Sequence, residues 1–398
     1  MSSFVPARVI TRSRPSEGRR FGILSTFPPT ECGIATFSAA LAAGIIANGA
    51  TVDVVRCGAR PHLEDVSVLG TVANESSGNL AAAVDVLNAT DVVIIQHEYG
   101  LYDGPDGSAI LPVLDRITAP MIVVAHTVVS SPTVNQQLVL EQVCAAADMV
   151  VVMTDTGRSR LVAGFDVPAS KVVVIPHGAA TPPAERDKPD ESPPLQAPRL
   201  LTWGLLGPGK GIEWAIDAVV ELADLDPRPD YIIAGTTHPK VLAHSGEAYR
   251  QMLIDRVGES ADRHSVTFDD TYRDLDSLTD LIRSADLVVL PYDSTDQVTS
   301  GVLVDAVAAG RPVVSTAFPH AVELLSSGAG LVVPQRDPAA LSGAIRAVLS
   351  DADLAASMAA EARRLAPALS WNAVARQYER LAGQLFAMRP TARPLARS

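Results

Sequence analysis

The sequence predicts an α/β fold made of two domains in tandem, each built around a parallel sheet. From Phe21 onward apolar strands alternate with helical stretches, and the strands are continuous runs of Val and Ile, which is typical of parallel strands buried on both faces. Residues 179–199 contain six prolines among Glu, Asp and Ser, which excludes a helix or a central strand and indicates an interdomain linker. The alternation restarts at Leu200. A chain of 398 residues suits two domains of about 150 to 200 residues each.

The individual elements follow from this pattern. First-domain strands are expected at Phe21–Ser25, Val52–Arg56, Val92–Gln96, Met121–Ala125, Met149–Met153 and Val172–Pro176, with Ala-rich helices such as Ile34–Asn48 and Leu80–Leu87 between them. Second-domain strands are expected at Leu200–Gly204, Tyr231–Gly235, Ser265–Phe268, Leu287–Pro291, Pro312–Thr316 and Leu331–Pro334. Helices between these are expected at Ile212–Ala223, Ala248–Val257, Asp274–Ser284, Val302–Ala309 and Pro338–Leu349. The stretch Trp371–Met388 has apolar residues at three- and four-residue steps, so we expect a crossing helix or an ordinary terminal helix.

The ends of the chain differ in composition from its middle. The first twenty residues carry five arginines against one acid, Glu17, and lack the apolar segment of a secretory signal. A disordered tail is the simplest interpretation, with an organelle address or contact with anionic lipid heads as alternatives. The predicted order is a disordered basic tail (1–19), a first domain (20–178), the linker (179–199), a second domain (200–370), the crossing helix (371–388) and a second tail (389–398).

Composition excludes several classes of function. A net charge of −13 argues against a nucleic-acid partner, which needs a basic face. No apolar run approaches the about 20 residues that cross a bilayer, so we expect a cytoplasmic protein, at most peripheral to the inner face of a membrane. Cys32, Cys57 and Cys144 form neither a metal cluster nor an even disulfide set. We expect no metal and no cofactor.

The segment from Gln297 to Pro312 is the most informative part of the second domain. It follows an apolar strand, crosses a polar loop and opens a helix, which places unpaired helix-opening N–H groups at a strand's carboxyl end. Such a helix start is a ready phosphate site, and Asp305 inside the helix could reach a ribose hydroxyl. The alternative is that Ser300 is an N-cap and Gly301 a turn residue, as at most such joints.

Each domain also opens with a glycine-containing loop after its first strand. Gly33 lies in the first such loop, and Gly207, Gly209 and Gly211 lie in the second. Glycines let the backbone approach a ligand closely, and Lys210 would stand at the start of the next helix as a phosphate-seeking cation. Neither segment matches the dinucleotide fingerprint or the P-loop, so loose glycine-rich turns are the alternative.

Several motifs in order along the chain carry a family resemblance. They are Gly33-Ile34, His126 in Val124–Thr127, Ile175–Gly178, Gly204–Gly211 with Lys210, the Gln297–Pro312 segment, Glu323–Leu325 and Gly328–Pro334. From Phe21 to about Met388 the chain resembles retaining glycosyltransferases with two Rossmann-like domains facing across a cleft, the GT-B fold. This is the family 4-like "glycosyl transferases group 1" family, which contains bacterial mannosyl- and glucosyltransferases and sucrose-type synthases.

The resemblance implies a role for each matching position. Lys210 would neutralise the donor diphosphate beside Gly209, and the backbone N–H groups of Thr299, Ser300, Gly301 and Val302 would hold its phosphate or the sugar. Asp305 stands where the family has a glutamate that binds the nucleotide ribose. Gly33 would let the first domain's loop close over the diphosphate. His126 would hydrogen-bond a hydroxyl of the transferred sugar, although a satisfied histidine at a strand end is the alternative.

Two positions depart from the family pattern. Gln297 replaces the family's first glutamate, so a neutral amide stands next to the donor sugar in place of a carboxylate. Leu205 replaces an arginine, which removes a fork-shaped phosphate ligand. Arg250 or Arg273 could compensate, or could be surface arginines. His97 and Glu98 follow another strand of the first domain and could face the acceptor or form a solvated loop.

The resulting hypothesis is a metal-independent retaining glycosyltransferase. It would move a hexose, mannose or glucose, from a nucleoside diphosphate sugar to a carbohydrate or glycolipid acceptor, with His126, Lys210 and Gln297 as the residues nearest the chemistry. A weak membrane-surface contact is a further expected interaction. One alternative is a nucleotide-sugar 2-epimerase, which shares two tandem Rossmann-like domains. Another is a sugar-nucleotide sensor or inactive partner subunit of the same fold.

Overall fold

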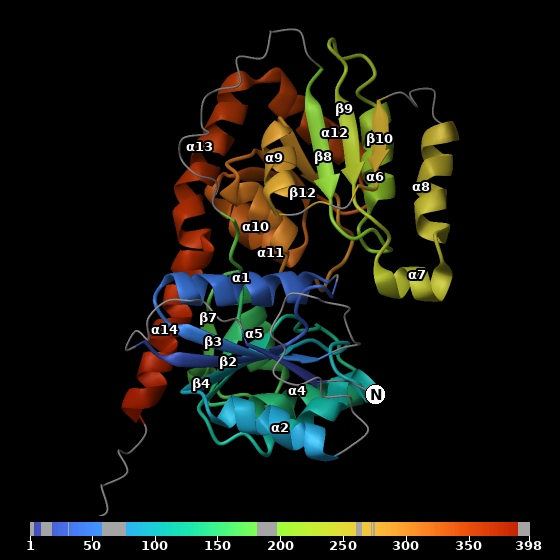
Figure 1. The fold of residues 1–398 in the computed structure, drawn as a ribbon. Helices are drawn as coiled ribbons and strands as arrows, with labels where there is room; N and C mark the ends of the chain where they lie inside the picture. Colours follow the sequence, from blue (N-terminus) through green and yellow to red (C-terminus); the bar gives the residue numbers. More distant parts are fainter. Residues whose placement is uncertain are drawn as a thin grey trace, which may run out of the picture. The chain divides into compact units, whose positions relative to one another are not determined.

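A computed structural model describes residues 4–8, 18–30, 32–57, 77–180, 197–259, 265–271, 273 and 275–388 (Figure 1). The chain divides into two compact units. Unit 1 comprises Met1–Gly178 and Trp371–Ser398, and unit 2 comprises Ala179–Ser370. Of the expected linker and tails, residues 1–3, 9–17, 181–196 and 389–398 lie outside the described part.

Unit 1 is built on a seven-stranded sheet in the order β1-β3-β2-β4-β5-β6-β7. All pairs from β3 to β7 are parallel, and β1 pairs antiparallel with β3 at one edge. The strands are β1 Phe4–Arg8, β2 Arg20–Ser25, β3 Thr51–Cys57, β4 Val92–His97, β5 Met121–Ala125, β6 Met149–Val152 and β7 Val172–Val174.

Strand β1 corrects part of the expected N-terminal tail. Phe4–Arg8 forms a regular antiparallel ladder with β3, with Phe4 opposite Cys57 and Arg8 opposite Asp53. Pro6 is compatible with this position because β1 is an edge strand, where one N–H faces away from the sheet. The strand was not predicted, because the five arginines among the first twenty residues indicated a basic tail.

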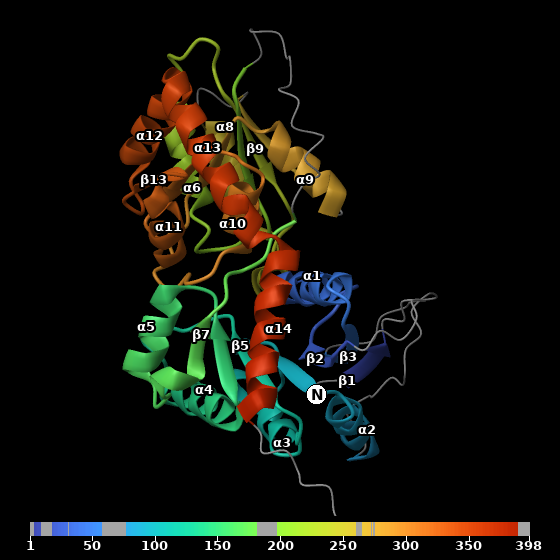
Figure 2. The same cartoon turned by 90° about the vertical axis from the view of Figure 1, so that its left-hand side faces the viewer.

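Helices cover both faces of the unit 1 sheet (Figures 1 and 2). Those on one face are α1 Gly33–Ala47 and α14 Trp371–Met388, whose apolar residues pack with Phe21, Ile23 and Ile94. The other face is covered by α2 Ser77–Asn88, α3 Leu111–Leu114, α4 Val134–Ala146 and α5 Asp155–Gly164. Two 3₁₀ helices, Pro105–Ile110 and Ala169–Lys171, complete the unit.

Unit 2 has a six-stranded parallel sheet in the order β10-β9-β8-β11-β12-β13. The strands are β8 Arg199–Trp203, β9 Asp230–Ala234, β10 Val266–Asp269, β11 Leu287–Leu290, β12 Val313–Thr316 and β13 Gly330–Val333. In chain order this is the 3-2-1-4-5-6 arrangement of a Rossmann fold, and its order reverses between β8 and β11. The helices that follow β8 and β11 therefore lie on opposite faces of the sheet.

The helices of unit 2 again form two layers (Figure 1). One layer consists of α9 Leu275–Ser284, α10 Gly301–Ala308 and α13 Ala352–Leu369, and the other of α6 Ile212–Val220, α8 Ala248–Glu259 and α12 Pro338–Ser350. The remaining elements are α7 Pro239–Ser245, α11 Pro319–Leu324 and the 3₁₀ helix Leu325–Ser327.

The predicted fold class is confirmed, and every strand expected from the sequence is present within two residues of its expected ends. Helix α13 was not expected. Its Pro367 lies in the last turn, and the preceding Ala-rich stretch still forms a helix of 18 residues. Helix α14 begins at Trp371 as expected and belongs to unit 1.

Candidate functional site

The candidate residues of unit 2 gather at the point where the sheet order reverses. Gly204 to Lys210 follow β8, and Pro291 to Thr299 follow β11, its neighbour in the sheet. Ligands of open parallel α/β sheets bind outside the carboxyl ends of the strands at such a reversal. The topology thus brings Lys210, Gln297 and the start of α10 to the same edge.

The backbones of these two loops are in close contact. Gly211 is the N-cap of α6 and has a φ of 63°, and a Cβ added there would lie 2.0 Å from the carbonyl oxygen of Pro291. The Asp293 N–H donates to the carbonyl oxygen of Gly209 at 3.2 Å. A side chain at position 211 would push the loops apart, so glycine there holds the geometry of the edge.

We expect Gly211→Ala to destabilise unit 2 by about 2 kcal/mol or more, because it adds a left-handed backbone penalty to a backbone clash. Urea unfolding measures the loss. Gly328→Ala is the matched control, since Gly328 is also left-handed, with a φ of 105°, but a Cβ there meets nothing within 4 Å. Equal losses in the two variants would remove the packing role of Gly211.

Lys210 is held over an aromatic ring. Its Nζ lies 4.3 Å from the centre of the Tyr292 ring, which in turn stacks on Phe318 with ring centres 4.9 Å apart. No carboxylate in the described ranges forms an ion pair with Lys210. The cation–π contact orients the ammonium group and leaves its N–H donors available for an anion.

The loop that carries Tyr292 is itself fixed by two other strands. Gln335 donates from Nε2 to the carbonyl oxygens of Tyr292 and Ser294 at 3.2 and 3.1 Å. The Thr316 hydroxyl, at the end of β12, donates to the same Tyr292 carbonyl. Neither Gln335 nor Thr316 was predicted, because their role depends on strands that are distant in sequence.

The start of α10 corrects the expected donor set. Ser300 caps the helix by accepting the Leu303 N–H at 3.3 Å, as in the alternative interpretation of Ser300 as an N-cap. Its own N–H donates to Nδ1 of the buried His320 at 2.8 Å, so this group is already used within the protein. The first-turn N–H groups of Gly301 and Val302 have no protein acceptor among the described residues, as at a normal helix start.

His320 was missed by the sequence interpretation. It lies in α11, two residues after Phe318, and is 4% exposed. With Nδ1 accepting from Ser300, its ring fixes the direction in which α10 begins. A histidine after a Phe-Pro pair at a strand's carboxyl end was the available signal, but its partner is 20 residues away.

Gln297 turns its amide onto its own loop. Its Nε2 donates to the carbonyl oxygen of Thr299, and its backbone carbonyl accepts the His320 N–H at 3.4 Å. The side-chain carbonyl oxygen keeps its capacity to accept a hydroxyl. The Gln297 side chain therefore helps to hold the loop in its conformation. A carboxylate at this position could not make the same hydrogen bond, because it has no N–H to donate.

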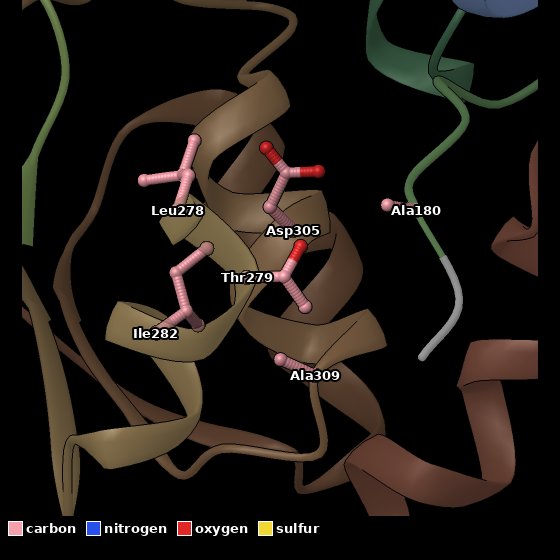
Figure 3. A pocket seen from close by; sticks show the side chains of 6 residues that line it. All are labelled: Ala180, Leu278, Thr279, Ile282, Asp305 and Ala309. Carbon is pink, nitrogen blue, oxygen red and sulfur yellow. The ribbon is translucent and has the colours of Figure 1, made fainter. Parts of the chain in front are cut away.

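Asp305 lines a small cavity between α9 and α10. The cavity is about 10 Å³, enough for about one water molecule, and Leu278, Thr279, Ile282, Ala309 and Ala180 form the rest of its wall (Figure 3). Burial raises the pKa of the Asp305 carboxyl to about 7, although part of the residue is exposed. At neutral pH the group is thus a mixture of donor and acceptor forms, in contrast to the permanent carboxylate expected from the sequence.

The two arginines considered as replacements for the missing phosphate ligand have partners. Arg250 donates from Nη1 to the carbonyl oxygen of Gly235 at 2.8 Å and lies over Phe268. Arg273 pairs with Asp269, whose pKa this contact lowers to about 2. Both arginines therefore have structural partners in this structure.

In unit 1 the candidate His126 follows β5 and contacts the two neighbouring elements. Its backbone N–H donates to the backbone carbonyl oxygen of His97 at 3.0 Å. Its ring packs edge-on against the Phe37 ring of α1, with ring centres 4.9 Å apart. Its Nε2 lies 2.6 Å from Oε1 of the fully buried Gln96. Since an amide oxygen can only accept, Nε2 carries the proton and Nδ1 is left as an acceptor.

Three histidines near this edge are kept neutral. Burial, together with the charges of His177 and His97, lowers the pKa of His126 to about 3. Burial lowers the pKa of His97 and of His177 to about 4 each. His126 is therefore a neutral hydrogen-bonding group near pH 7 and not a cation.

The other unit 1 candidates differ in exposure. Gly33 begins α1 and is exposed, and a Cβ there would meet no atom within 4 Å. Glu98 accepts the Thr127 hydroxyl and the Tyr99 N–H, so it is tied to the His126-Thr127 loop. His97 is 1% exposed and points away from solvent, which does not fit the predicted contact with an acceptor.

Metal and membrane features were searched over the described residues. Among them no cluster of three or more His, Cys, Asp and Glu side chains could hold a metal ion. No helix in the same ranges is both long and apolar enough to span a bilayer.

Comparison with known proteins shows what parts of the chain are similar to. Residues 197–351, most of unit 2, match the family model described as "Glycosyl transferases group 1". The D-inositol 3-phosphate glycosyltransferase of Kineococcus radiotolerans is 29% identical over 259 residues, which cover 59% of this chain and 57% of that relative. The enzyme of the same name from Corynebacterium jeikeium is 29% identical, with 63% and 61% covered. The chain thus matches less than two thirds of the length of these relatives.

Solved structures share the fold over nearly the whole chain. Sucrose-phosphate synthase from Thermosynechococcus elongatus superposes with a TM-score of 0.70 at 20% identity, covering 93% of this chain and all of the other. Anabaena HepE in complex with UDP-glucose gives a TM-score of 0.67 at 16% identity, covering 92% and 100%. The chain thus has the GT-B fold, its residues 197–351 are similar to the group 1 glycosyltransferase family model, and it is distantly similar to D-inositol 3-phosphate glycosyltransferases.

Proposed function

We propose that this protein transfers a hexose, glucose or mannose, from a nucleoside diphosphate sugar to a carbohydrate or glycolipid acceptor, with retention at the anomeric carbon. One observation carries the proposal. An oriented cation, Lys210, and the start of α10 with two unused N–H groups stand at the same sheet edge of the unit that matches the family model.

The donor diphosphate is the group that this edge suits. A nucleoside diphosphate leaves with increasing negative charge, and Lys210 together with the N–H groups of Gly301 and Val302 would stabilise that charge. Asp305, one turn further along α10, would accept or donate a hydrogen bond to the ribose. No residue needs to hold a metal ion for these interactions.

The sugar would be recognised by neutral groups. We assign the lone pair of His126 Nδ1 to a hydroxyl of the transferred sugar, and the side-chain carbonyl of Gln297 to a second hydroxyl. Retention through attack on the leaving-group face lets the departing phosphate oxygen take the acceptor's proton, so no side chain is assigned as a general base. The base is proposed to be uracil, since UDP-glucose is the ligand of the structural neighbour HepE.

Nucleotide binding tests the donor half of the proposal. UDP should raise the melting temperature more than GDP or ADP, because a ligand that binds the folded state stabilises it by mass action. Lys210→Ala should abolish most of the shift, whereas Lys240→Ala, which removes an exposed lysine on α7, should keep it. Equal shifts in wild type and Lys210→Ala would contradict the assigned phosphate ligand.

Replacement of Gly33 by Val should abolish transfer while the fold is retained. A Cβ at this position meets open space, so the substitution costs little stability, yet branched bulk at the start of α1 would block the approach of the loop to the diphosphate. Gly164→Val is the matched control, since Gly164 ends α5 and is equally unobstructed. Full transfer by Gly33→Val with an unchanged melting temperature would remove the role given to this loop.

A further inference from the structure

A second group of polar side chains lies at the carboxyl edge of the unit 2 sheet, after β9. Strand β9 is the neighbour of β8 on the side away from β11. The loop that follows β9 begins at Gly235 and leads through His238 into α7. Ligands of open parallel sheets bind at this edge. The proposed donor site uses the loops after β8 and β11, so the residues of the β9 loop have no role in it.

The loop after β9 is joined to the loop after β8 by backbone hydrogen bonds. The Leu206 N–H donates to the Thr236 carbonyl oxygen, and the His238 N–H donates to the Leu206 carbonyl oxygen, both at 2.8 Å. The two backbones also approach closely, because a Cβ added at Gly235 would lie 1.9 Å from the carbonyl oxygen of Gly204. His238 is therefore held in a fixed position beside the glycine-rich loop.

The His238 ring has one nitrogen that is free to donate. Its Nδ1 accepts the backbone N–H of Lys240 at 3.1 Å, so the neutral ring carries its proton on Nε2. Partial burial and the charges of Lys240 and Lys210 lower the pKa of His238, which favours this neutral form. Nε2 has no hydrogen-bond partner among the described residues. The ring is thus oriented with an unused N–H donor near Lys210.

Arg250 presents further unused donors at the same edge. It extends from α8, its Nη1 donates to the Gly235 carbonyl oxygen at 2.8 Å, and its guanidinium group lies over the Phe268 ring of β10. These contacts orient the group, but the hydrogen bond uses only one of its five N–H donors. No salt bridge in the described ranges involves Arg250. Its Nε and Nη2, one edge of the fork that binds phosphate, also have no acceptor there.

The order of the strands gives the direction in which a sugar nucleotide would lie along this edge. In the proposed function the sugar lies near Gln297, after β11, and Lys210, after β8, binds the diphosphate. The sugar is attached to the β-phosphate, so the α-phosphate lies on the other side of Lys210, toward β9. His238 and Arg250 present their unused donors on that side.

We propose that His238 and Arg250 bind the α-phosphate of the donor nucleotide, whereas Lys210 binds its β-phosphate. This inference rests on the proposed glycosyl transfer and adds two donor-binding residues to it. The Nε2–H of His238 and the free N–H groups of Arg250 donate to the non-bridging oxygens. They supply the phosphate donors that are lost where Leu205 replaces an arginine.

Truncated nucleotides test this assignment without turnover. UMP and UDP, GMP and GDP, and AMP and ADP are titrated by calorimetry into the full-length protein and its variants. His238→Asn and Arg250→Lys should each weaken the monophosphate and the diphosphate of the bound base by the same factor, at least about tenfold, because both nucleotides contain the α-phosphate. Lys210→Ala should weaken the diphosphate at least about tenfold and the monophosphate less than about threefold.

Matched variants separate ligand binding from packing. Asn in place of His238 keeps an oxygen that accepts the Lys240 N–H but has no donor in the place of Nε2. His238→Gln restores a donor there and should recover most of the affinity. Arg256→Lys is the control for Arg250→Lys, since Arg256 lies on the same helix and its fork is filled by a carboxylate. His244→Gln is the control for the α7 histidine, and both controls should bind as the parent does.

Three results would overturn the proposal. The first is unchanged binding of the monophosphate in both His238→Asn and Arg250→Lys. The second is a larger loss for the diphosphate than for the monophosphate in these variants, which would place the two residues at the β-phosphate. The third is absence of binding by all six nucleotides, which would also contradict the proposed donor. If Arg250→Lys does not fold, the comparison of His238→Asn with His238→Gln carries the test.

Transfer kinetics separate this inference from the proposed function. The α-phosphate keeps its charge as the sugar leaves, so His238→Asn and Arg250→Lys should raise KM for the donor sugar at least about tenfold and change kcat less than about threefold. An unchanged KM in both variants would overturn the inference and leave glycosyl transfer standing. Weaker monophosphate binding by the variants of a protein that transfers no sugar would support the α-phosphate site and contradict glycosyl transfer.

Discussion

Lys210→Ala should lower kcat/KM for the donor sugar by about 30-fold or more. A charge-assisted hydrogen bond to a phosphate contributes about 2 kcal/mol, and 1.36 kcal/mol corresponds to a factor of ten in rate. The loss should appear in kcat as well as KM, because charge on the diphosphate grows as the sugar leaves. Initial rates of nucleoside diphosphate release at varied donor concentration give both constants.

The fold should survive this substitution. Lys210 is partly exposed and contacts the Tyr292 ring through its ammonium group, a contact worth about 1 kcal/mol at such a site. Lys210→Arg is an informative companion, since it keeps the positive charge but changes the geometry of the N–H donors. Recovery by Lys210→Arg with loss in Lys210→Ala supports the electrostatic role. Unchanged kinetics in Lys210→Ala would contradict it.

Acid should destabilise unit 1 well before its carboxylates are protonated. The folded pKa values of His97 and His177 are about 4 and that of His126 about 3, against about 6.5 in the unfolded chain. Each depressed pKa means that the unfolded state binds the proton first, so the stabilisation is complete above pH 6.5 and is lost as pH falls toward 4. Between pH 6.5 and pH 5 the loss is about 2 kcal/mol for each histidine.

Hydrogen exchange of the β4 and β5 amides at several pH values measures this loss within unit 1. His97→Leu removes one buried ring whose two nitrogens have no hydrogen-bond partner in the described residues, so it should reduce the slope of stability against pH by about one proton. His244→Gln, at an exposed histidine of α7 in unit 2, is the control for removal of a histidine outside unit 1. A parent protein whose unit 1 stability is constant from pH 6.5 to 5 would show that these histidines are not kept neutral by burial.

The fold could be predicted closely because its signals are local. Buried parallel strands read as continuous Val and Ile runs, and β2, β4 and β5 are 0 to 3% exposed throughout their apolar residues. Strand β1 could not be predicted, because its pairing with β3 spans about fifty residues and its sequence is interrupted by Pro6. Helix α13 was likewise not predicted, because its sequence contains Pro367. A proline in the last turn leaves most of the helix intact.

The site was predicted less completely, since side-chain partners lie far apart in sequence. The N-cap role of Ser300 was an open alternative and is observed, whereas the use of its N–H by His320 could not be read from spacing. Asp305 was expected as a carboxylate, and only its packing between two helices raises its pKa toward neutrality. The contact of Gln96 with His126 joins two strands and had no sequence signal.

Nucleoside diphosphate release from a panel of nucleotide sugars, with and without acceptors, tests the central claim most directly. The panel holds UDP-, GDP- and ADP-linked glucose and mannose, with phosphorylated, carboxylated and neutral sugars as acceptors. We predict release that depends on acceptor, with retained anomeric configuration in the product. Interconversion of the sugar nucleotide without release would indicate an epimerase, and binding with no turnover would indicate a sensor or partner subunit. Either result would contradict a glycosyltransferase.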